Sequence, residues 1–233
     1  STYAAPFIRR SSPDATIIQL AADLEFFGLQ SYTFQDDPFP KRVVRWADRR
    51  TNSAFISYLL KHYIDGVIAV SELMQDAIRD MMPKGPIEIV HPYVQPDMAD
   101  RLDALSTPEF GSHRVLTVCE GREHKGVDLL AEAWPTVREE IPDASLSIVG
   151  DGHPDRYSDI SGVSVQGYVE DIVSAYERAS MYVQPARADA FPVTVMEAMW
   201  ASRVPLVTRT TGSRSLVTDI ADDIIVEPRP NAI

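Results

Sequence analysis

The sequence predicts an α/β fold with parallel sheets, and two observations predict it. Short β-branched runs recur along the chain, and each is followed by a helical pattern. The runs are nearly continuous in apolar residues rather than alternating, which is typical of parallel strands covered by helices on both faces. The helices between the runs would supply that cover.

Nine strands are expected, three in the first part of the chain and six in the second. Two of the helices between them are well marked, at Val127–Trp134 and Asp171–Ala179. The strands are expected at Ala15–Leu20, Gly66–Val70, Ile87–Val90, Val115–Cys119, Leu146–Val149, Val163–Gln166, Met181–Gln184, Val204–Thr208 and Ile224–Val226.

The pattern lapses after His91 into a stretch that contains Pro and Asp, and strand-like sequence resumes at Arg114. We therefore expect a first domain over residues 1–92, an interdomain linker over 93–113 and a second domain over 114–233. Three strands are fewer than a doubly wound sheet normally has. The first domain is accordingly expected to be incomplete.

Composition restricts the function classes. The 233 residues are 45% hydrophobic, enough for an ordinary core, and no apolar run approaches the roughly 18 to 20 residues that span a bilayer. Without an N-terminal basic segment followed by an apolar one, a cytoplasmic protein is expected. The net charge of −12 disfavours nucleic acid as a partner, because such binding depends on cations that neutralise phosphates.

The charged residues are biased in kind. Asp outnumbers Glu by 21 to 13, and only 4 of the 22 cations are Lys. This bias suits the salt-rich cytosol of a halophilic archaeon, whereas the alternative is an ordinary acidic mesophilic protein. Both stay open, because surface charge bears on solubility and not on fold.

The segment Asp189–Met199 follows a predicted strand and is the most informative part of the chain. Pro192 fits the first position of a helix, so the free amides of Val193, Thr194 and Val195 would form a phosphate site at the strand end.

Glu197 lies further along that helix among apolar neighbours, and a buried carboxylate needs hydrogen-bond donors. The donors are either arginines, such as Arg203 or Arg209, or the hydroxyls of a bound ribose. The helix alone does not decide between them.

A second segment, Cys119–Gly126, lies where a strand ends and a helix begins. Arg122 and Lys125 could neutralise a diphosphate there, although a basic pair in a loop is often only solvated surface. Cys119 is interpreted as a core thiol. Gly150 ends another strand and would allow close approach of a ligand, and the histidines lack metal-ligand spacing, so no metal is assigned.

Four segments in this order resemble the retaining glycosyltransferases of GT-B type, the glycosyl transferases group 1 family (family 4 type). The segments are Asp65–Ser71, Arg122–Leu130, Ser145–Gly152 and Asp189–Val207. The resemblance implies two Rossmann-like domains, the first incomplete, in a chain truncated at both ends. It also implies a pair of carboxylates eight positions apart, here Asp189 near the donor sugar and Glu197 on the nucleotide ribose.

The same resemblance assigns roles to the other candidates. Arg122 and Lys125 would bind the donor diphosphate and, with Asp189, are the candidate catalytic residues. The base would lie beside the Gly167–Val169 segment. The candidate donor-binding residues are Gly121, Gly150, Tyr168, Val169, Phe191, Pro192, Val193, Thr194 and Glu197.

The resemblance implies a hexosyltransferase that moves a sugar from a nucleoside-diphosphate sugar to a saccharide or lipid-linked acceptor, with retention and without a cofactor or metal. The alternatives are a non-catalytic nucleotide-sugar binding module, or an epimerase or phosphorylase of the same architecture.

A basic cluster over Lys41–Arg50 has two interpretations. It is either a peripheral contact with the inner face of the cell membrane, where a lipid-linked acceptor would be met, or a solvated helix face balanced by nearby Asp residues.

Overall fold

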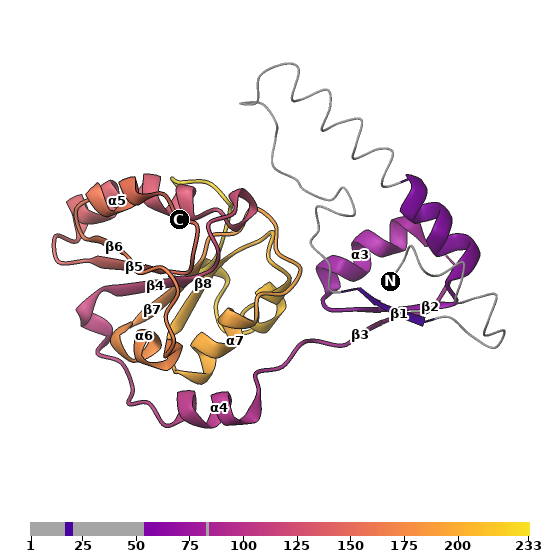
Figure 1. Cartoon of the computed structure of the whole chain (residues 1–233), viewed down its shortest axis with the longest axis horizontal. Helices are drawn as coiled ribbons and strands as arrows, with labels where there is room; N and C mark the ends of the chain where they lie inside the picture. The colour runs from indigo at the N-terminus through magenta and orange to yellow at the C-terminus, as the bar shows by residue number, and fades with distance from the viewer. Residues whose placement is uncertain (1–16, 21–53, 83) are drawn as a thin grey trace, which may run out of the picture. The chain divides into compact units, whose positions relative to one another are not determined.

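A computed structural model describes residues 17–20, 54–82 and 84–233, and the chain divides into two compact units, residues 1–92 and 93–233. The predicted basic helix over Lys41–Arg50 lies outside the described residues, so its two interpretations stay open. The elements of each unit are labelled in Figure 1.

The described part of the first unit contains a three-stranded parallel sheet in the order β1-β2-β3, formed by Ile17–Leu20, Gly66–Ala69 and Ile87–Ile89. Residues 54–63 are helical, and α3 spans Glu72–Met81. Ser71 caps α3, since its side chain accepts a hydrogen bond of 3.2 Å from the amide of Met74.

The second unit contains a six-stranded parallel sheet in the order β6-β5-β4-β7-β8-β9. The order reverses between β4 and β7, which is the place where ligands bind in open α/β sheets. The strands are β4 Arg114–Val118, β5 Ser145–Val149, β6 Val163–Val165, β7 Met181–Gln184, β8 Val204–Thr208 and β9 Ile225–Val226.

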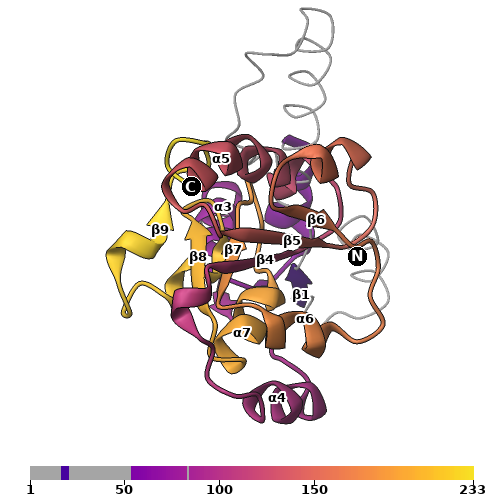
Figure 2. The same cartoon turned by 90° about the vertical axis from the view of Figure 1, so that its left-hand side faces the viewer.

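Helices cover both faces of this sheet, as Figure 2 shows. The helix α5 (Val127–Glu140) packs on one face, and α6 (Ile172–Arg178) and α7 (Val193–Trp200) pack on the other. The α/β prediction with parallel sheets is therefore confirmed. Short 3-10 turns complete the unit at η4 Phe110–Ser112, η5 Glu123–Lys125, η6 Asp155–Asp159, η7 Gly212–Leu216 and η8 Asp222–Ile224.

Two predicted boundaries are wrong. Residues 93–113, expected as a linker, contain helix α4 (Pro96–Asp103), and its Leu102 is fully buried against α6 and α7. The helix expected to end at Trp134 continues through Pro135 to Glu140, because Trp134 and Val137 both pack into the core beside β5. In both cases the burial of apolar side chains decides the structure, and in α5 it outweighs the local signal from Pro135.

Candidate active site

The loop that follows β4 lies along the loop that follows β5. The Cys119 amide donates to the Val149 carbonyl (3.0 Å) and the Gly121 amide to the Asp151 carbonyl (2.8 Å), so the strand pairing continues past the sheet edge. The 3-10 turn η5 then places Lys125 at the start of α5. The basic segment predicted from sequence thus lies at the carboxyl ends of the strands.

Lys125 and Asp189, two of the three candidate catalytic residues, form an ion pair although 64 residues separate them. Lys125 Nζ donates to Asp189 Oδ2 at 2.7 Å, and the two side chains are 24% and 8% exposed. The other carboxylate oxygen of Asp189 accepts from the Phe191 amide at 3.3 Å. The fold therefore joins the basic loop to the segment that leads into α7.

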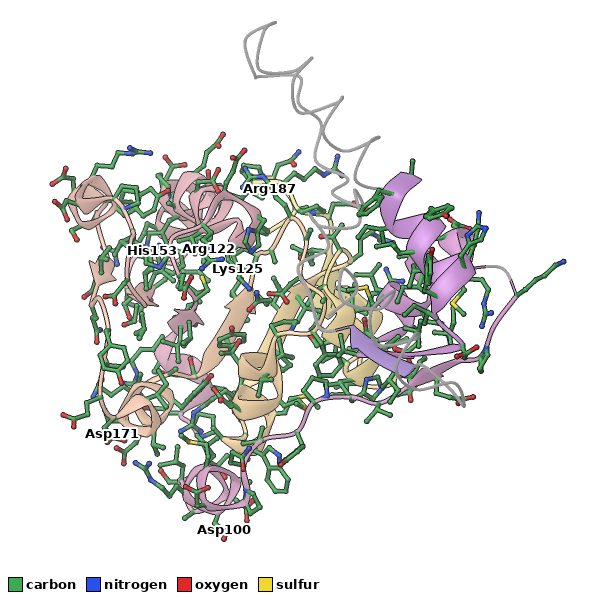
Figure 3. The ribbon with its side chains drawn as sticks, turned by 45° about the vertical axis from the view of Figure 1, so that its right-hand side comes forward. Asp100, Arg122, Lys125, His153, Asp171 and Arg187 are labelled. Carbon is green, nitrogen blue, oxygen red and sulfur yellow. The ribbon has the colours of Figure 1, made fainter. Side chains whose placement is uncertain are left out.

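Arg122, the third candidate, lies in a different environment. Its Nε donates to Glu120 Oε2 at 2.6 Å, and the two side chains are 58% and 62% exposed. Figure 3 labels Arg122, Lys125 and His153 in one region of the view, whereas Asp171 precedes α6 and Asp100 lies in α4. Arg122 is thus an exposed surface cation at the cavity, in contrast to the more buried Lys125.

Arg187 supports this arrangement and was not predicted. Its guanidinium binds both carboxylate oxygens of Asp128, at 2.6 and 2.7 Å, and it also donates to the Glu123 carbonyl at 2.9 Å. It therefore holds η5, and with it Lys125, against the loop after β7. No local pattern could reveal this, because Arg187 and Asp128 are 59 residues apart.

A cavity of about 540 Å³ opens at the carboxyl ends of β4 and β5. At Gly121 and Gly150 the two loops pack closely, since a Cβ on Gly121 would lie 2.1 Å from the Gly152 carbonyl oxygen and one on Gly150 would lie 2.0 Å from that of Cys119. Only glycine fits at either place. The lining residues are Val118, Cys119, Glu120, Gly121, Arg122, Val149, Gly150, Asp151, Gly152, Tyr168 and Thr194.

Five of the predicted site residues line this cavity: Gly121, Arg122, Gly150, Tyr168 and Thr194. Tyr168 is 77% exposed, and its amide donates to Asp151 Oδ1 at 2.8 Å, which fixes the segment at the rim. The remaining predicted residues lie outside the lining. They are Lys125, Val169, Asp189, Phe191, Pro192, Val193 and Glu197.

The start of α7 differs in detail from the prediction. Pro192 is the residue before the first helical residue, Val193, rather than the first one itself. The amide of Val195, expected to be free, donates to the Pro192 carbonyl at 3.3 Å. The amides offered to a phosphate are therefore those of Val193 and Thr194 alone.

Glu197 is half-buried, and its hydrogen-bond donor is a tyrosine. The Tyr176 hydroxyl donates to Glu197 Oε2 at 2.9 Å. The arginine interpretation is wrong, because Arg203 donates to main-chain carbonyls and Arg209 pairs with Glu227. Burial raises the pKa of Glu197, against a smaller lowering effect of the Tyr176 hydrogen bond.

The thiol of Cys119 is suited to a structural position. Burial raises its pKa to about 12, so the thiolate that a nucleophile requires is not populated near neutral pH. Among the described residues no group of three or more His, Cys, Asp or Glu side chains could hold a metal ion. In the same residues no helix is long and apolar enough to cross a membrane.

A six-stranded parallel sheet with a cavity at the carboxyl ends of its strands defines a Rossmann-like class of fold. The profile of the family described as Glycosyl transferases group 1 matches residues 112–233, and the chain belongs to this family.

The relatives differ in how much of this chain they match, from 40% for a sequence relative to 99% and 100% for two solved structures. An uncharacterized glycosyltransferase of Haemophilus influenzae is 31% identical over 101 residues, which are 40% of this chain and 28% of that protein. Sucrose-phosphate synthase of Thermosynechococcus elongatus has a TM-score of 0.69 at 18% identity and covers 99% of this chain and 59% of its own.

HepE of Anabaena, solved in complex with UDP and glucose, has a TM-score of 0.68 at 14% identity, over 100% of this chain and 64% of its own. This chain therefore spans less than two thirds of these relatives. At such identities the structural likenesses establish the fold, which agrees with the predicted GT-B type.

Proposed function

We propose that this chain binds a nucleoside-diphosphate sugar at the carboxyl edge of the six-stranded sheet and transfers the sugar, with retention of configuration, to a saccharide or lipid-linked acceptor. The observation that carries the proposal is the Lys125–Asp189 ion pair, which joins the basic loop, whose Gly121 and Arg122 line the cavity, to the segment entering α7. Membership of the Glycosyl transferases group 1 family supports the reaction class.

The diphosphate is assigned to Lys125, Arg122 and the amides of Val193 and Thr194. Charge grows on the departing diphosphate as the glycosidic bond breaks, and fixed cations and amides lower the barrier by stabilising that charge. Lys125 suits this role because its ammonium is held in place and only 24% exposed, which weakens competition from water. Arg122 supplies a second, adjustable cation.

The remaining parts of the donor have their own partners in this proposal. Asp189 orients the hexose ring, Glu197 accepts from the ribose, and the base lies beside Tyr168 and Val169. Gly121 and Gly150 line the cavity and let the two loops that form it pack closely, because any side chain there would collide with the opposite loop. No cofactor or metal is assigned, and the cytoplasmic location remains an expectation.

Calorimetric titration with UDP, GDP and ADP tests the binding step. We expect one of them to bind the full chain, and Lys125→Met to weaken that binding at least about tenfold, because a charge-assisted hydrogen bond to phosphate is lost. Lys84→Met is the matched control, since Lys84 is an exposed lysine of the other unit and keeps wild-type affinity. If none of the three nucleotides binds, the proposal is wrong.

Release of free nucleoside diphosphate tests the transfer step. Incubation with UDP-hexose or GDP-hexose and a saccharide or glycolipid acceptor is expected to release diphosphate only when the acceptor is present. Tight binding without release under any of these conditions favours a non-catalytic nucleotide-sugar binding module. Conversion of the sugar without transfer favours the epimerase alternative.

A further inference from the structure

Two tyrosines lie beneath α7, and the proposed reaction gives neither of them a role. Tyr176 comes from α6 and Tyr182 from β7, and both are fully buried, with ring centroids 6.2 Å apart. Burial raises the pKa of both hydroxyls well above the usual value. They therefore remain protonated, hydrogen-bonding groups across the physiological pH range.

The two hydroxyls have different partners. The Tyr176 hydroxyl donates to Glu197 Oε2 at 2.9 Å and lies 3.2 Å from the Thr194 carbonyl oxygen. The Tyr182 hydroxyl lies 2.6 Å from Gln184 Oε1 and 2.7 Å from Thr194 Oγ1. Only Tyr176 contacts the carboxylate, while Tyr182 fixes the threonine that lines the cavity.

Tyr176 is itself fixed at its main chain. Arg203, only 2% exposed, donates through Nε to the Tyr176 carbonyl at 2.7 Å, and through its other nitrogens to the carbonyls of Ser106 and Glu177. The ring is packed against Tyr182 and the hydroxyl reaches α7. Because both its main chain and its ring are held in place, the Tyr176 hydroxyl has a fixed position. It therefore restricts Glu197 to one side-chain conformation.

A neutral donor leaves Glu197 able to bind something else. An arginine would bind both carboxylate oxygens in a fork and neutralise the charge. The tyrosine uses one oxygen, and among the described residues no hydrogen bond is formed by the other, Oε1. Glu197 therefore keeps its charge and one acceptor, which is the chemistry that a vicinal pair of sugar hydroxyls requires.

We propose that Tyr176 is a positioning residue, which holds Glu197 by one carboxylate oxygen so that the other accepts from a ribose hydroxyl of the nucleotide. In this way it sets the preference of the protein for ribose over deoxyribose. The inference rests on the proposed function, since it requires a nucleotide at the site.

The experiment uses the full chain and the tightest binder among UDP, GDP and ADP, together with its 2′-deoxy and 3′-deoxy forms. In the wild-type protein the loss of the contacted hydroxyl is expected to weaken binding about ten- to a hundredfold, as for a hydrogen bond to a charged group. In Tyr176→Phe that ratio is expected to fall to about threefold or less, because the carboxylate is no longer held in place.

Tyr182→Phe is the matched control, since it removes a hydroxyl from an equally buried ring that does not touch Glu197. It is expected to keep the ribose preference even if overall affinity changes. Glu197→Gln keeps the shape of the side chain and is expected to lose the ribose preference. Tyr176→Phe is expected to add no further loss in the double variant, so the effects of the two substitutions are not additive. Thermal unfolding of each variant verifies that it folds.

The outcomes separate the two proposals. If a nucleotide binds and Tyr176→Phe keeps the full ribose preference, the role of Tyr176 is wrong and the proposed function stands. If a nucleotide binds but the wild-type protein has no preference for ribose, the inference is also wrong. If no nucleotide binds, both proposals are overturned.

Discussion

The two carboxylates eight positions apart, Asp189 and Glu197, are held in opposite ways. Asp189 pairs with a cation, Lys125, at 2.7 Å and is almost fully buried. Glu197 is half-buried and is held by the neutral hydroxyl of Tyr176. The first carboxylate is therefore charge-compensated and links two loops, whereas the second has no cationic partner among the described residues. Two carboxylates of one sequence motif thus have different physical environments.

The largest effect is expected when Asp189 loses its charge. Asp189→Asn leaves the Lys125 ammonium without a charged partner, and we expect the free energy of unfolding to fall by about 1–3 kcal/mol. Sugar transfer is expected to slow on the order of a hundredfold, because the ring is no longer oriented. Denaturant unfolding and diphosphate release measure the two quantities. Unchanged stability would show that the ion pair is not a structural link.

A smaller effect of opposite sign is expected at Glu197. Its folded-state pKa is raised, so its contribution to stability is fully present below the unfolded pKa of about 4.3 and is lost as pH rises through the folded value. The Glu197→Gln variant has no carboxyl group at this position, so its stability does not fall as the pH rises through the pKa of Glu197. The stability of the wild-type protein relative to this variant should therefore decrease as the pH rises above about 4.5, as followed by urea unfolding. A difference that is independent of pH contradicts the assignment.

The smallest effect is expected at Arg122. Its ion pair with Glu120 is mostly exposed, so Arg122→Ala should change the free energy of unfolding by less than about 0.5 kcal/mol. Nucleotide affinity should fall less than in Lys125→Met, and the difference from wild type should shrink in 0.5 M salt, where exposed charges are screened. An affinity loss as large as that of Lys125→Met would contradict the lesser role assigned to Arg122.

The sequence predicted the strands of both sheets well, because their apolar runs are short and continuous. It also predicted the two loops that contain Lys125 and Asp189 as parts of one site. It did not predict that these two side chains form an ion pair. Tyr176 and Arg187 were not predicted as parts of the site, and Arg203 was predicted as a partner of Glu197 but binds main-chain carbonyls, including that of Tyr176. Each acts through a partner at least 21 residues away, and no periodicity or spacing marks such contacts.

Helix α4 was missed for a different reason. Its sequence, PDMADRLD, is half charged and short, which favours a connecting segment over a packed helix, although Pro96 fits the first position of a helix. Only two of its residues, Ala99 and Leu102, are buried, and the surface that makes this burial favourable comes from α6 and α7 much later in the chain. Tertiary packing decided the structure here, as it also did at Pro135.

The family profile begins at residue 112, but the folded unit begins at Tyr93, with α4 against α6 and α7. A recombinant fragment that begins at residue 112 would lack Val94, Ala99 and Leu102. These residues pack in the same core as α6 and α7, the helices that contain Tyr176 and Glu197. The exposed apolar surface would favour self-association, and the two helices would lose part of the packing that supports Tyr176 and Glu197. For protein production, the amino-terminal boundary of this unit is Tyr93.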